Sequence, residues 1–446
     1  MEASAAHTGR APKETFMQKA FEAYQASYEA LLPKLNADIE KYRMGQFTVK
    51  VIDKNGAPVS ANIQAKQTAH AFHFGTNALM LGAMGEKEQA YRDAITDLFN
   101  FVTTTFCWGV METEPGKYRF SEDSEEIYRR PPSDRALRFA KENNLTIKGQ
   151  PLFVGRWLPD WVPHDFEQLK AFWIRFVREV AKRYDGKFYL FDVVNESYQD
   201  DGSWQNMSWL PVSYSEFTKW MLQTAGEIFS KNCKMERNEA NHVNFGAYGD
   251  KYFEENKSLL DAGVRLDSIG FQYHLFNGDA CLNEHITGDL SLESIYKTYH
   301  KMSTLGVPMY ITEITIPTVY STMTQEEGED LQANVIEKLY RLWFSIPQMA
   351  GIVYWNLSDG DAWPGEELCR GCLLDQNMRK KKAYHTLERL IKEEWNTSLS
   401  MQTNQDGTAE FRGFYGSYEL SVQANGTTSI HTATFDKKSN TCTITL

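Results

Sequence analysis

The sequence predicts an α/β fold, a (β/α)8 TIM barrel in which parallel strands alternate with helices. Two observations favour this fold. Apolar, strand-like runs alternate with helical patterns eight times between residues 72 and 356, and a barrel of this kind takes roughly 250 residues or more. Two of the runs end in a glutamate, Glu196 and Glu313, at the strand end where barrels carry functional residues. A doubly wound sheet competes, but no Gly-rich phosphate-binding turn follows a strand.

Each of the eight predicted strands is a short run of β-branched, aromatic and other apolar residues, the composition of strands buried on both faces. They are expected near residues 72–76, 101–106, 145–153, 189–194, 243–248, 268–272, 308–312 and 351–355. Helical patterns at residues 166–184 and 215–229 occupy two of the intervals. We therefore predict a barrel domain over residues 71–396.

The N-terminal segment predicts a helix over residues 12–45. Its apolar residues recur at steps of four and three, the stripe of an amphipathic helix. They are Met17, Phe21, Tyr24, Tyr28, Leu31 and Leu35. Packing onto its own domain is the commoner outcome for such a helix than a coiled-coil or partner-binding surface.

Alternating strand patterns flank the barrel on both sides. Residues 47–52 and 59–65 alternate, with a hairpin turn expected at Asn55-Gly56. Residues 409–422 and 429–435 alternate near turns at Asp406-Gly407 and Asn425-Gly426. Neither piece has enough strands to be stable alone, so residues 46–70 and 397–446 are predicted to form one accessory β-domain. It braces the barrel or binds polysaccharide, and its few strands favour bracing.

Composition and charge argue against several classes of protein. A net charge of −12 disfavours a nucleic-acid surface. No run approaches the ~18 apolar residues of a membrane span. Residues 1–9 lack the charged and apolar regions of a signal peptide, so we expect an intracellular protein or one whose signal has been removed. Aromatic residues make up 13% of the chain, with 11 Trp, and exposed aromatic faces suit sugar rings.

The cysteines are scattered along the chain. They are Cys107, Cys233, Cys281, Cys369, Cys372 and Cys442. Only Cys369-Arg-Gly-Cys372 has metal or redox spacing, and no nearby His or Cys supplies further ligands. We expect free thiols or a local disulfide there instead of zinc, and no metal or other cofactor.

The two strand-end glutamates predict a pair of carboxyl groups in one cleft. Retaining hydrolysis of a glycosidic bond needs a carboxylic acid to protonate the leaving oxygen and a carboxylate to attack the anomeric carbon, roughly 5 to 5.5 Å apart. Glu196 and Glu313 end the fourth and seventh predicted strands. A single strand-end carboxylate more often caps a helix or pairs with an arginine, but two of them, with Asn195 and His274 nearby, favour a catalytic pair.

Other strand ends supply candidate substrate-binding groups. The sixth predicted strand ends in Gln272 and His274, and a neutral imidazole can donate to Glu313, although a lone histidine is more often structural. The eighth is followed by Trp355 and Trp363, which suit the floor and wall of a sugar subsite. Loop packing is the alternative for Trp363. The amide of Asn195 is expected to bind a sugar hydroxyl beside the reacting carbon.

These segments together resemble glycoside hydrolase family 10, the retaining endo-β-1,4-xylanases, over residues 72–395. The most specific motifs are Asp192-Val-Val-Asn-Glu196, which resembles the acid/base strand, and Tyr310-Ile-Thr-Glu313, which resembles the nucleophile strand. Gln272-Tyr-His274, Leu158-Pro-Asp-Trp161 and residues 355–363 also fit. The resemblance implies that Glu196 is the general acid/base, Glu313 the nucleophile, His274 its partner and Trp355 the subsite floor.

The sequence departs from the family where the sugar on the non-reducing side is bound. The family's Asn and Lys after the second strand are missing from residues 103–108, and its third-strand pattern Gly-His-Thr-Leu-Val-Trp-His reads Gly149-Gln-Pro-Leu-Phe-Val-Gly155 here. The usual Asp two residues after the nucleophile is Thr315. The residues expected to reshape the pocket are Gln150, Arg156, Trp157 and Trp108, with salt-bridged scaffolding as the alternative for Arg156.

The sequence thus predicts a retaining glycoside hydrolase that acts by double displacement on a carbohydrate or glycoside, with xylan or xylo-oligosaccharide as the family default. A non-xylan plant β-glycoside, of saponin or aryl type, is one alternative. A noncatalytic carbohydrate-binding barrel is another, which the two carboxylates disfavour. A metal-dependent barrel hydrolase is disfavoured because the chain has no His-x-His on the first strand and no HExxH. Sugar identity, endo or exo action and oligomeric state stay open.

Overall fold

A closed barrel of eight parallel strands forms the centre of the computed structural model, which describes residues 11–198, 207–244, 246–280, 282 and 291–446. The neighbouring strands run in the order β10-β11-β12-β3-β4-β7-β8-β9. Along the chain they are β3 (His73–Asn77), β4 (Phe101–Thr105), β7 (Thr146–Gln150), β8 (Leu190–Asn195), β9 (Lys234–Glu239), β10 (Ser268–His274), β11 (Met309–Thr315) and β12 (Met349–Tyr354). The predicted (β/α)8 fold is confirmed.

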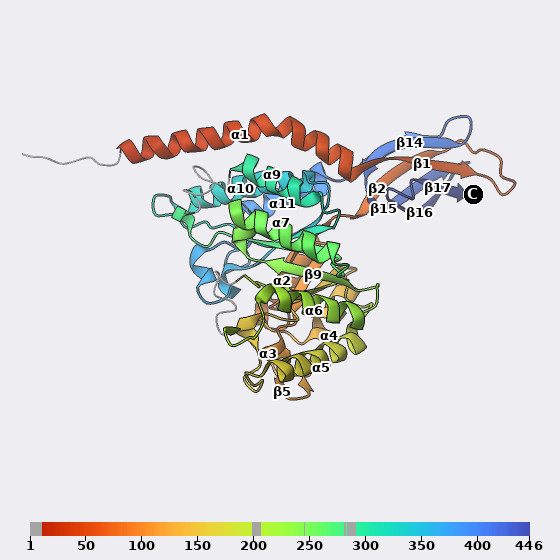
Figure 1. Ribbon diagram of the computed structural model, residues 1–446. Helices are drawn as coiled ribbons and strands as arrows, with labels where there is room; N and C mark the ends of the chain where they lie inside the picture. The colour runs from red at the N-terminus through yellow and green to blue at the C-terminus, as the bar shows by residue number, and fades with distance from the viewer. Residues whose placement is uncertain (1–10, 199–206, 245, 281, 283–290) are drawn as a thin grey trace, which may run out of the picture.

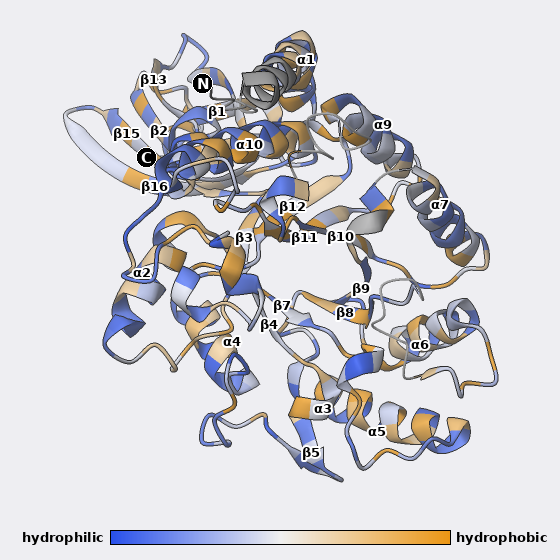
Figure 2. Cartoon of the chain, turned by 90° about the vertical axis from the view of Figure 1, so that its left-hand side faces the viewer, coloured by the Kyte–Doolittle hydropathy of each residue, from blue (hydrophilic) through white to orange (hydrophobic). Residues whose placement is uncertain are grey.

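Helices surround the ring of strands (Figure 2). They are α2 (Glu88–Leu98), α4 (Ser133–Glu142), α5 (Phe166–Tyr184), α6 (Tyr214–Ile228), α7 (Gly246–Asp261), α9 (Leu292–Ser303), α10 (Gln325–Ser345) and α11 (Lys382–Arg389). Helix α6 illustrates why they form. Its N-cap Ser213 and Glu216 exchange side chain to backbone hydrogen bonds in a capping box, and Phe217, Met221 and Leu222 are buried against the barrel. Helix α5 has the predicted bounds.

The fifth strand was predicted in the wrong place. Residues 241–244 form a 3-10 turn and α7 begins at Gly246, whereas the strand is β9, almost entirely buried despite its charged residues. Glu236 contacts Lys148 inside the barrel, and the Arg237 guanidinium lies 2.8 Å from the Glu255 carboxylate. Partners inside the fold neutralise these charges, so β9 can be buried with charged residues in it. The strand therefore has no apolar run that sequence reasoning could detect.

The N-terminal helix α1 (Ala11–Arg43) lies across α9 and α10 (Figure 1). Its own residues Tyr24, Tyr28 and Leu35 are buried in the main hydrophobic core. At its end, Arg43 donates to the carbonyl oxygens of Phe344 (2.6 Å) and Ile346. The helix thus packs onto its own barrel, as its apolar stripe predicted.

Strands from both ends of the chain form two small sheets that project from the barrel (Figure 1). The strands are β1 (Met44–Ile52), β2 (Asn62–His70), β13 (Ser398–Gln402), β14 (Thr408–Phe414), β15 (Gly416–Ala424), β16 (Thr427–Phe435) and β17 (Thr441–Thr445). One sheet has the order β14-β1-β17 and the other β13-β2-β15-β16. Between them Phe47 stacks on Phe435, with ring centroids 4.6 Å apart, and meets Phe411 edge to face at 5.3 Å. The expected extra sheets are therefore present.

The hairpin predicted at Asn55-Gly56 forms only next to its turn, where Ile52 and Pro58 make an isolated antiparallel bridge, and it does not extend along β1 and β2. The turn exists, with Gly56 at φ 83° and its N–H donating to the Asp53 carbonyl at 3.0 Å. However, β1 pairs with β14 and β17, and β2 pairs with β13 and β15. Residues 53–61 therefore carry the chain from one sheet to the other. At Asn425-Gly426 both φ angles are positive and the turn joins paired β15 and β16, as expected of a hairpin.

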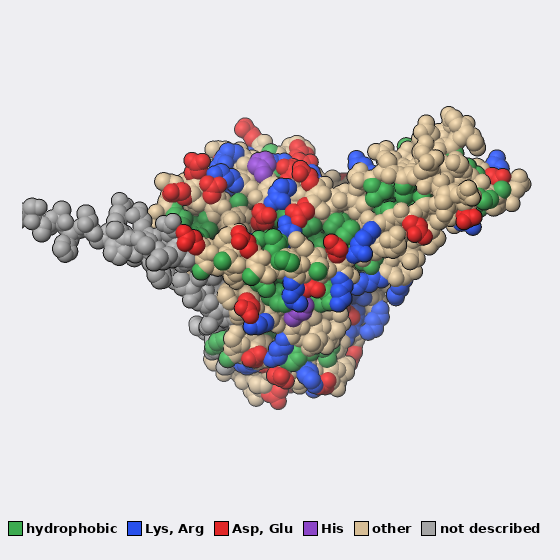
Figure 3. All heavy atoms as spheres, turned by 90° about the horizontal axis from the view of Figure 1, so that it is seen from above, with side chains coloured by type: hydrophobic (Ala, Val, Ile, Leu, Met, Phe, Trp, Pro, Cys, Tyr) green, Lys and Arg blue, Asp and Glu red, His purple; other side chains and the backbone are tan. Residues whose placement is uncertain are grey.

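The described helices agree with the lack of a long apolar run in the sequence. Within the described ranges, no helix has the length and apolar character needed to cross a membrane. Acidic and basic side chains are interspersed over the face seen from above (Figure 3).

Candidate active site

A cavity of about 500 Å³ lies at the carboxyl ends of the barrel strands, within the size range of small-molecule sites. All of the predicted site residues except Trp108 line it. They are Gln150, Arg156, Asn195, Glu196, Gln272, His274, Glu313, Trp355 and Trp363. The side chain of Trp157 lines it as well. These residues from five different strands or the loops after them are thus brought to one place.

Glu313, on β11, is buried and held by hydrogen bonds at both carboxylate oxygens. Its Oε1 accepts from Asn238 Nδ2 at 3.1 Å and from Gln150 Nε2, and its Oε2 lies 3.0 Å from His274 Nε2. An ionised carboxylate only accepts, so Nε2 of His274 carries the proton toward it. The other ring nitrogen, Nδ1, lies 2.9 Å from the Thr315 hydroxyl, which can donate to it. A neutral imidazole therefore satisfies both of its neighbours.

Glu196 follows β8 in a left-handed backbone conformation, with φ 54°. For a residue with a Cβ this conformation costs about 1 to 2 kcal/mol, and such strain gathers at functional sites. The Glu196 N–H donates to the Asn238 carbonyl at 3.0 Å and anchors the turn. Its Oε1 accepts from Gln272 Nε2 at 2.9 Å, and its Oε2 from Arg156 Nη2 at 2.7 Å. Arg156 is thus both ion-paired and part of the cavity wall.

Three amide side chains connect the two glutamates. Gln272 Nε2, which donates to Glu196, also lies 3.3 Å from Asn195 Oδ1. That oxygen accepts from Asn238 Nδ2 at 2.7 Å, and the same nitrogen donates to Glu313. A continuous chain of hydrogen bonds therefore runs from one carboxylate to the other.

Sequence reasoning missed Asn238 because it lies on β9, the strand predicted in the wrong place. It also missed two arginines of the cavity wall, Arg129 and Arg130. They lie on the long connection between β4 and α4, which also contains α3 (Trp108–Met111), β5 (Glu112–Glu114) and β6 (Lys117–Tyr118). An arginine pair in a connection carries no periodic signal that would place it at a site.

Aromatic rings border the cavity on two sides. The Trp355 ring lies 5.9 Å from the His274 ring at 71°, and Phe276 stacks on His274 with centroids 4.8 Å apart. On another wall, Trp157 and Trp363 meet edge to face at 5.6 Å. Flat apolar surfaces thus lie beside carboxylates, an arrangement suited to sugar rings.

The prediction that Trp108 reshapes the pocket is wrong. Its ring is 1% exposed, and its Nε1 donates to the Glu112 carboxylate at 2.8 Å. The ring packs 5.8 Å from Phe176 of α5 and 6.0 Å from Trp161. Trp108 begins helix α3, which turns the side chain away from the barrel axis, and Cys107 lines the cavity instead.

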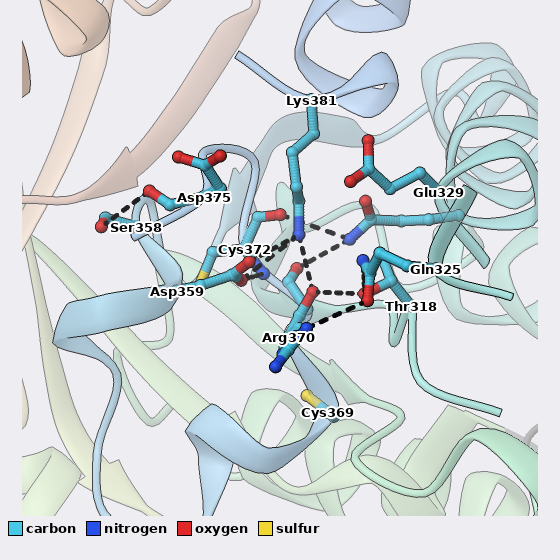
Figure 4. Close-up of polar contacts among 12 residues, drawn as sticks. Thr318, Gln325, Glu329, Ser358, Asp359, Cys369, Arg370, Cys372, Asp375 and Lys381 are labelled. Atoms are coloured by element: carbon cyan, nitrogen blue, oxygen red, sulfur yellow. Dashed lines mark hydrogen bonds and ion pairs between the residues drawn. The ribbon is translucent and has the colours of Figure 1, made fainter. Parts of the chain in front are cut away.

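A buried polar cluster supports the loop after β12 (Figure 4). This loop carries Trp363 to the cavity. Lys381 Nζ lies 3.0 Å from the Asp359 carboxylate and donates to the Arg370 carbonyl at 2.7 Å. Asp359 also accepts from the Cys372 N–H at 3.0 Å. Cys369 and Cys372 are buried free thiols, and burial raises the pKa of Cys369 to about 11. Such thiols serve packing more than reactivity.

Metal coordination finds no support in the part of the chain that the structure describes. Groups of three or more His, Cys, Asp or Glu side chains placed to share an ion do not occur there. Of the alternatives expected for the Cys369 and Cys372 pair, the structure has free thiols.

Known proteins with related sequences include enzymes and one regulator. The model of glycosyl hydrolase family 10 matches residues 64–389. The anti-sigma-I factor RsgI6 of Acetivibrio thermocellus is 28% identical over 403 residues, 89% of this chain but 47% of that protein, so the chain spans about half of its length. Endo-1,4-beta-xylanase B of Thermotoga neapolitana is 24% identical over 324 residues, 68% of this chain and 84% of the enzyme.

Solved structures share the barrel fold. Xylanase 10B from Thermotoga petrophila RKU-1, in complex with xylobiose, is 21% identical with a TM-score of 0.60, covering 73% of this chain and 95% of that one. Native xylanase 10B from Thermotoga maritima is 22% identical, also with a TM-score of 0.60, over 73% and 96% of the two chains. Because the family model extends across all eight barrel strands and the cavity at their ends, this chain belongs to glycosyl hydrolase family 10.

Proposed function

We propose that this protein hydrolyses β-glycosidic bonds with retention of configuration, with Glu313 as the nucleophile and Glu196 as the general acid/base. One observation carries the proposal: both carboxylates line one cavity and are connected by the amides of Gln272, Asn195 and Asn238. Membership of a glycosidase family supports the same reaction. Two carboxyl groups with different surroundings are what double displacement requires.

The reaction proceeds in two steps. In the first, the Glu313 carboxylate attacks the anomeric carbon and forms a glycosyl ester, while protonated Glu196 gives its proton to the departing glycosidic oxygen. In the second, a water molecule displaces the sugar from Glu313, and Glu196 takes the proton from that water. Both carboxyl groups then return to their starting protonation states.

The surroundings of Glu313 suit an oriented nucleophile. Gln150, Asn238 and His274 donate to its oxygens from three different strands, so the carboxylate has little freedom to rotate. Thr315 in turn fixes the His274 ring. Preorganised donors of this kind lower the cost of reaching the reactive geometry.

The surroundings of Glu196 imply a movement. Oε2 of Glu196 accepts a hydrogen bond from Arg156 Nη2 at 2.7 Å, whereas a general acid must direct a proton at the leaving group. The Arg156 side chain is 54% exposed, so it can leave the carboxylate for solvent or for a group on the substrate at small cost. We infer that substrate binding displaces Arg156 before Glu196 acts as an acid.

Xylan or xylo-oligosaccharides are the proposed substrates, because several related proteins are named endo-1,4-beta-xylanases. A second candidate is a non-xylan plant β-glycoside of saponin or aryl type, supported by Gln150 and Val154 in the cavity wall, where the family resemblance led us to expect histidine and tryptophan. A third is a noncatalytic carbohydrate-binding barrel. It is kept because one relative is named an anti-sigma-I factor and not a hydrolase.

Chromogenic glycosides test the proposal. We expect release of nitrophenol from nitrophenyl β-xylobioside, β-xyloside or β-glucoside, or of reducing ends from xylan, with the β-anomer formed first in the proton NMR spectrum. Glu313→Gln is expected to lower kcat by roughly 10³-fold or more, as for other residues that act directly in the reaction. Glu142→Gln, on the exposed surface of α4, removes a carboxylate elsewhere and serves as the control.

The acid/base role has a separate readout. Nitrophenol leaves without protonation, so Glu196→Ala should slow the second step most, and added azide should restore turnover and yield a β-glycosyl azide. Initial release of the α-anomer would exclude retention. Inactivity of the folded protein on all of these substrates, with retained binding of oligosaccharides, would establish the noncatalytic barrel instead.

A further inference from the structure

Arg130 lies in the cavity wall against two indole rings that also contact each other. Its guanidinium carbon is 5.0 Å from the centroid of the Trp157 ring and 5.2 Å from that of the Trp363 ring. Because the two ring centroids are only 5.6 Å apart, the rings contact the guanidinium from neighbouring directions, and these cation–π contacts use none of its N–H donors. The edge of the group therefore stays available for hydrogen bonding.

The hydrogen-bonding capacity of Arg130 is largely unused. Its Nη1 donates to the Arg129 carbonyl at 2.8 Å, but its buried Nε has no hydrogen-bond partner. Across the described residues, no carboxylate forms an ion pair with it. Burial lowers the pKa of Arg130, which reflects the cost of keeping the charge there, yet an arginine remains protonated. A partly buried cation without an anion is unusual.

The neighbouring arginine does not find an anion within the described chain either. Arg129 donates to Asn356 Oδ1 at 2.8 Å and to the carbonyl of Asp361, both uncharged groups. The acid of this wall, Glu366, accepts from Asn356 Nδ2 at 2.8 Å, and it forms no ion pair with either arginine. Two adjacent guanidinium groups thus border the cavity in a protein whose net charge is −12.

Guanidinium and carboxylate match in shape and charge. Both are planar, and two parallel N–H donors meet two oxygens in a fork that a neutral sugar hydroxyl cannot fill. A pyranose carrying a carboxylate can rest against Trp157 or Trp363 and direct its acid toward Arg130. An acidic sugar would also offer the displaced Arg156 a second anion besides Glu196.

We propose that the cavity binds a glycoside that contains a uronic-acid unit, and that Arg130, held against Trp157 and Trp363, is the residue that recognises its carboxylate. The inference rests on the proposed hydrolase function and specifies the substrate class of the same cavity. It assigns specificity to a connection between β4 and α4 that supplies neither of the two glutamates.

Two oligosaccharides that differ in one group provide the test. One is a xylo-oligosaccharide with a glucuronic-acid branch, and the other is its carboxyl-reduced counterpart, in which the acid is a CH2OH group. We expect kcat/KM to be roughly 10- to 100-fold higher for the acidic oligosaccharide, the range of one charge-assisted hydrogen-bonded pair. The preference should shrink as salt is added, because the cavity is open to solvent.

Variants of Arg130 assign the effect. Arg130→Met keeps an apolar body against the indoles and should abolish the preference, while Arg130→Lys keeps the charge without the planar fork and should retain part of it. Arg178→Met, on the exposed face of α5, removes the same charge elsewhere and should keep the full preference. If Arg130→Met does not fold, the lysine variant and the salt dependence of the native protein decide.

The outcomes separate this inference from the proposed function. Equal hydrolysis of both oligosaccharides, or an undiminished preference in Arg130→Met, overturns the inference and leaves the hydrolase standing. If neither is hydrolysed but titration calorimetry shows tighter binding of the acidic one that is lost in Arg130→Met, the anion site is supported and hydrolysis is overturned. If neither is hydrolysed or bound, both fail.

Discussion

A buried group of three charges inside the barrel offers a quantitative test of how the fold holds them. Lys148 Nζ lies 2.8 Å from Asp192 Oδ1 and also contacts Glu236. The three side chains are at most 1% exposed. Burial raises the pKa of Asp192 well above its usual value, and nearby Glu236 raises it further, against the effect of Lys148. One proton on Asp192 would leave a single lysine facing a single carboxylate.

Two substitutions distinguish the roles of these groups. Lys148→Met leaves Glu236 buried without a cation and should lower the free energy of unfolding by about 3 to 5 kcal/mol. Asp192→Asn replaces a protonated acid with an amide of the same size and should cost about 1 kcal/mol or less near pH 5. The loss in free energy of unfolding should therefore be several-fold larger for Lys148→Met than for Asp192→Asn near pH 5.

The pH dependence has a defined sign. Because the pKa of Asp192 is higher in the folded than in the unfolded chain, its contribution to stability is present below the unfolded pKa, about 3.9, and is lost as pH rises toward the folded value. Between these limits the loss approaches about 1.4 kcal/mol per pH unit. Asparagine does not titrate, so Asp192→Asn should gain stability relative to the native protein as pH increases.

Urea unfolding of the native protein and both variants at pH 5, 7 and 9, followed by tryptophan fluorescence, measures these differences. A deficit of 3 kcal/mol or more for Asp192→Asn at every pH, equal to that of Lys148→Met, would show that Asp192 is ionised in the fold. The reasoning about the shared proton would then be wrong.

Three further predictions concern the site and the small sheets. Asn238→Ala removes a donor to Glu313 and should lower kcat on nitrophenyl glycosides by roughly 10²-fold, with unfolding curves as the control for stability. Thr315→Val removes the hydroxyl beside His274 and should lower kcat by about 10-fold, whereas Thr315→Ser should restore it; equal rates for both variants would contradict the contact. Phe47→Ala opens the core between the two sheets and should cost about 3 to 5 kcal/mol, measured by the thermal unfolding midpoint.

The barrel could be predicted from sequence because most of its strands are apolar runs ending in polar residues. Strand β9 could not, since Glu236 is neutralised by a partner on β7 and Arg237 by one on α7, and such pairing is invisible in one segment. Because β9 was not recognised from the sequence, Asn238 was missed as well. Its amide lies between the two glutamates. A site residue on an unrecognised strand is missed with the strand.

Local sequence patterns predict where a turn forms but not which strands pair on either side of it. Asn55-Gly56 does form a turn, yet β1 and β2 enter different sheets because their partners come from the C-terminal strands. Likewise, Trp108 follows β4 closely in sequence, but the start of α3 directs its ring to Glu112 and Phe176. In both cases the outcome depends on contacts between distant segments, which short-range spacing does not encode.

The paired sheets impose an order on biosynthesis. Strands β1 and β2 leave the ribosome before the barrel, but β13, β14, β15 and β17, which complete their hydrogen bonding, emerge after it. Until then two nine-residue strands present open edges, which are prone to pairing with other chains. The barrel is therefore translated while β1 and β2 still lack their partner strands. A chain that stopped after α11 would keep these strand edges exposed and prone to aggregation.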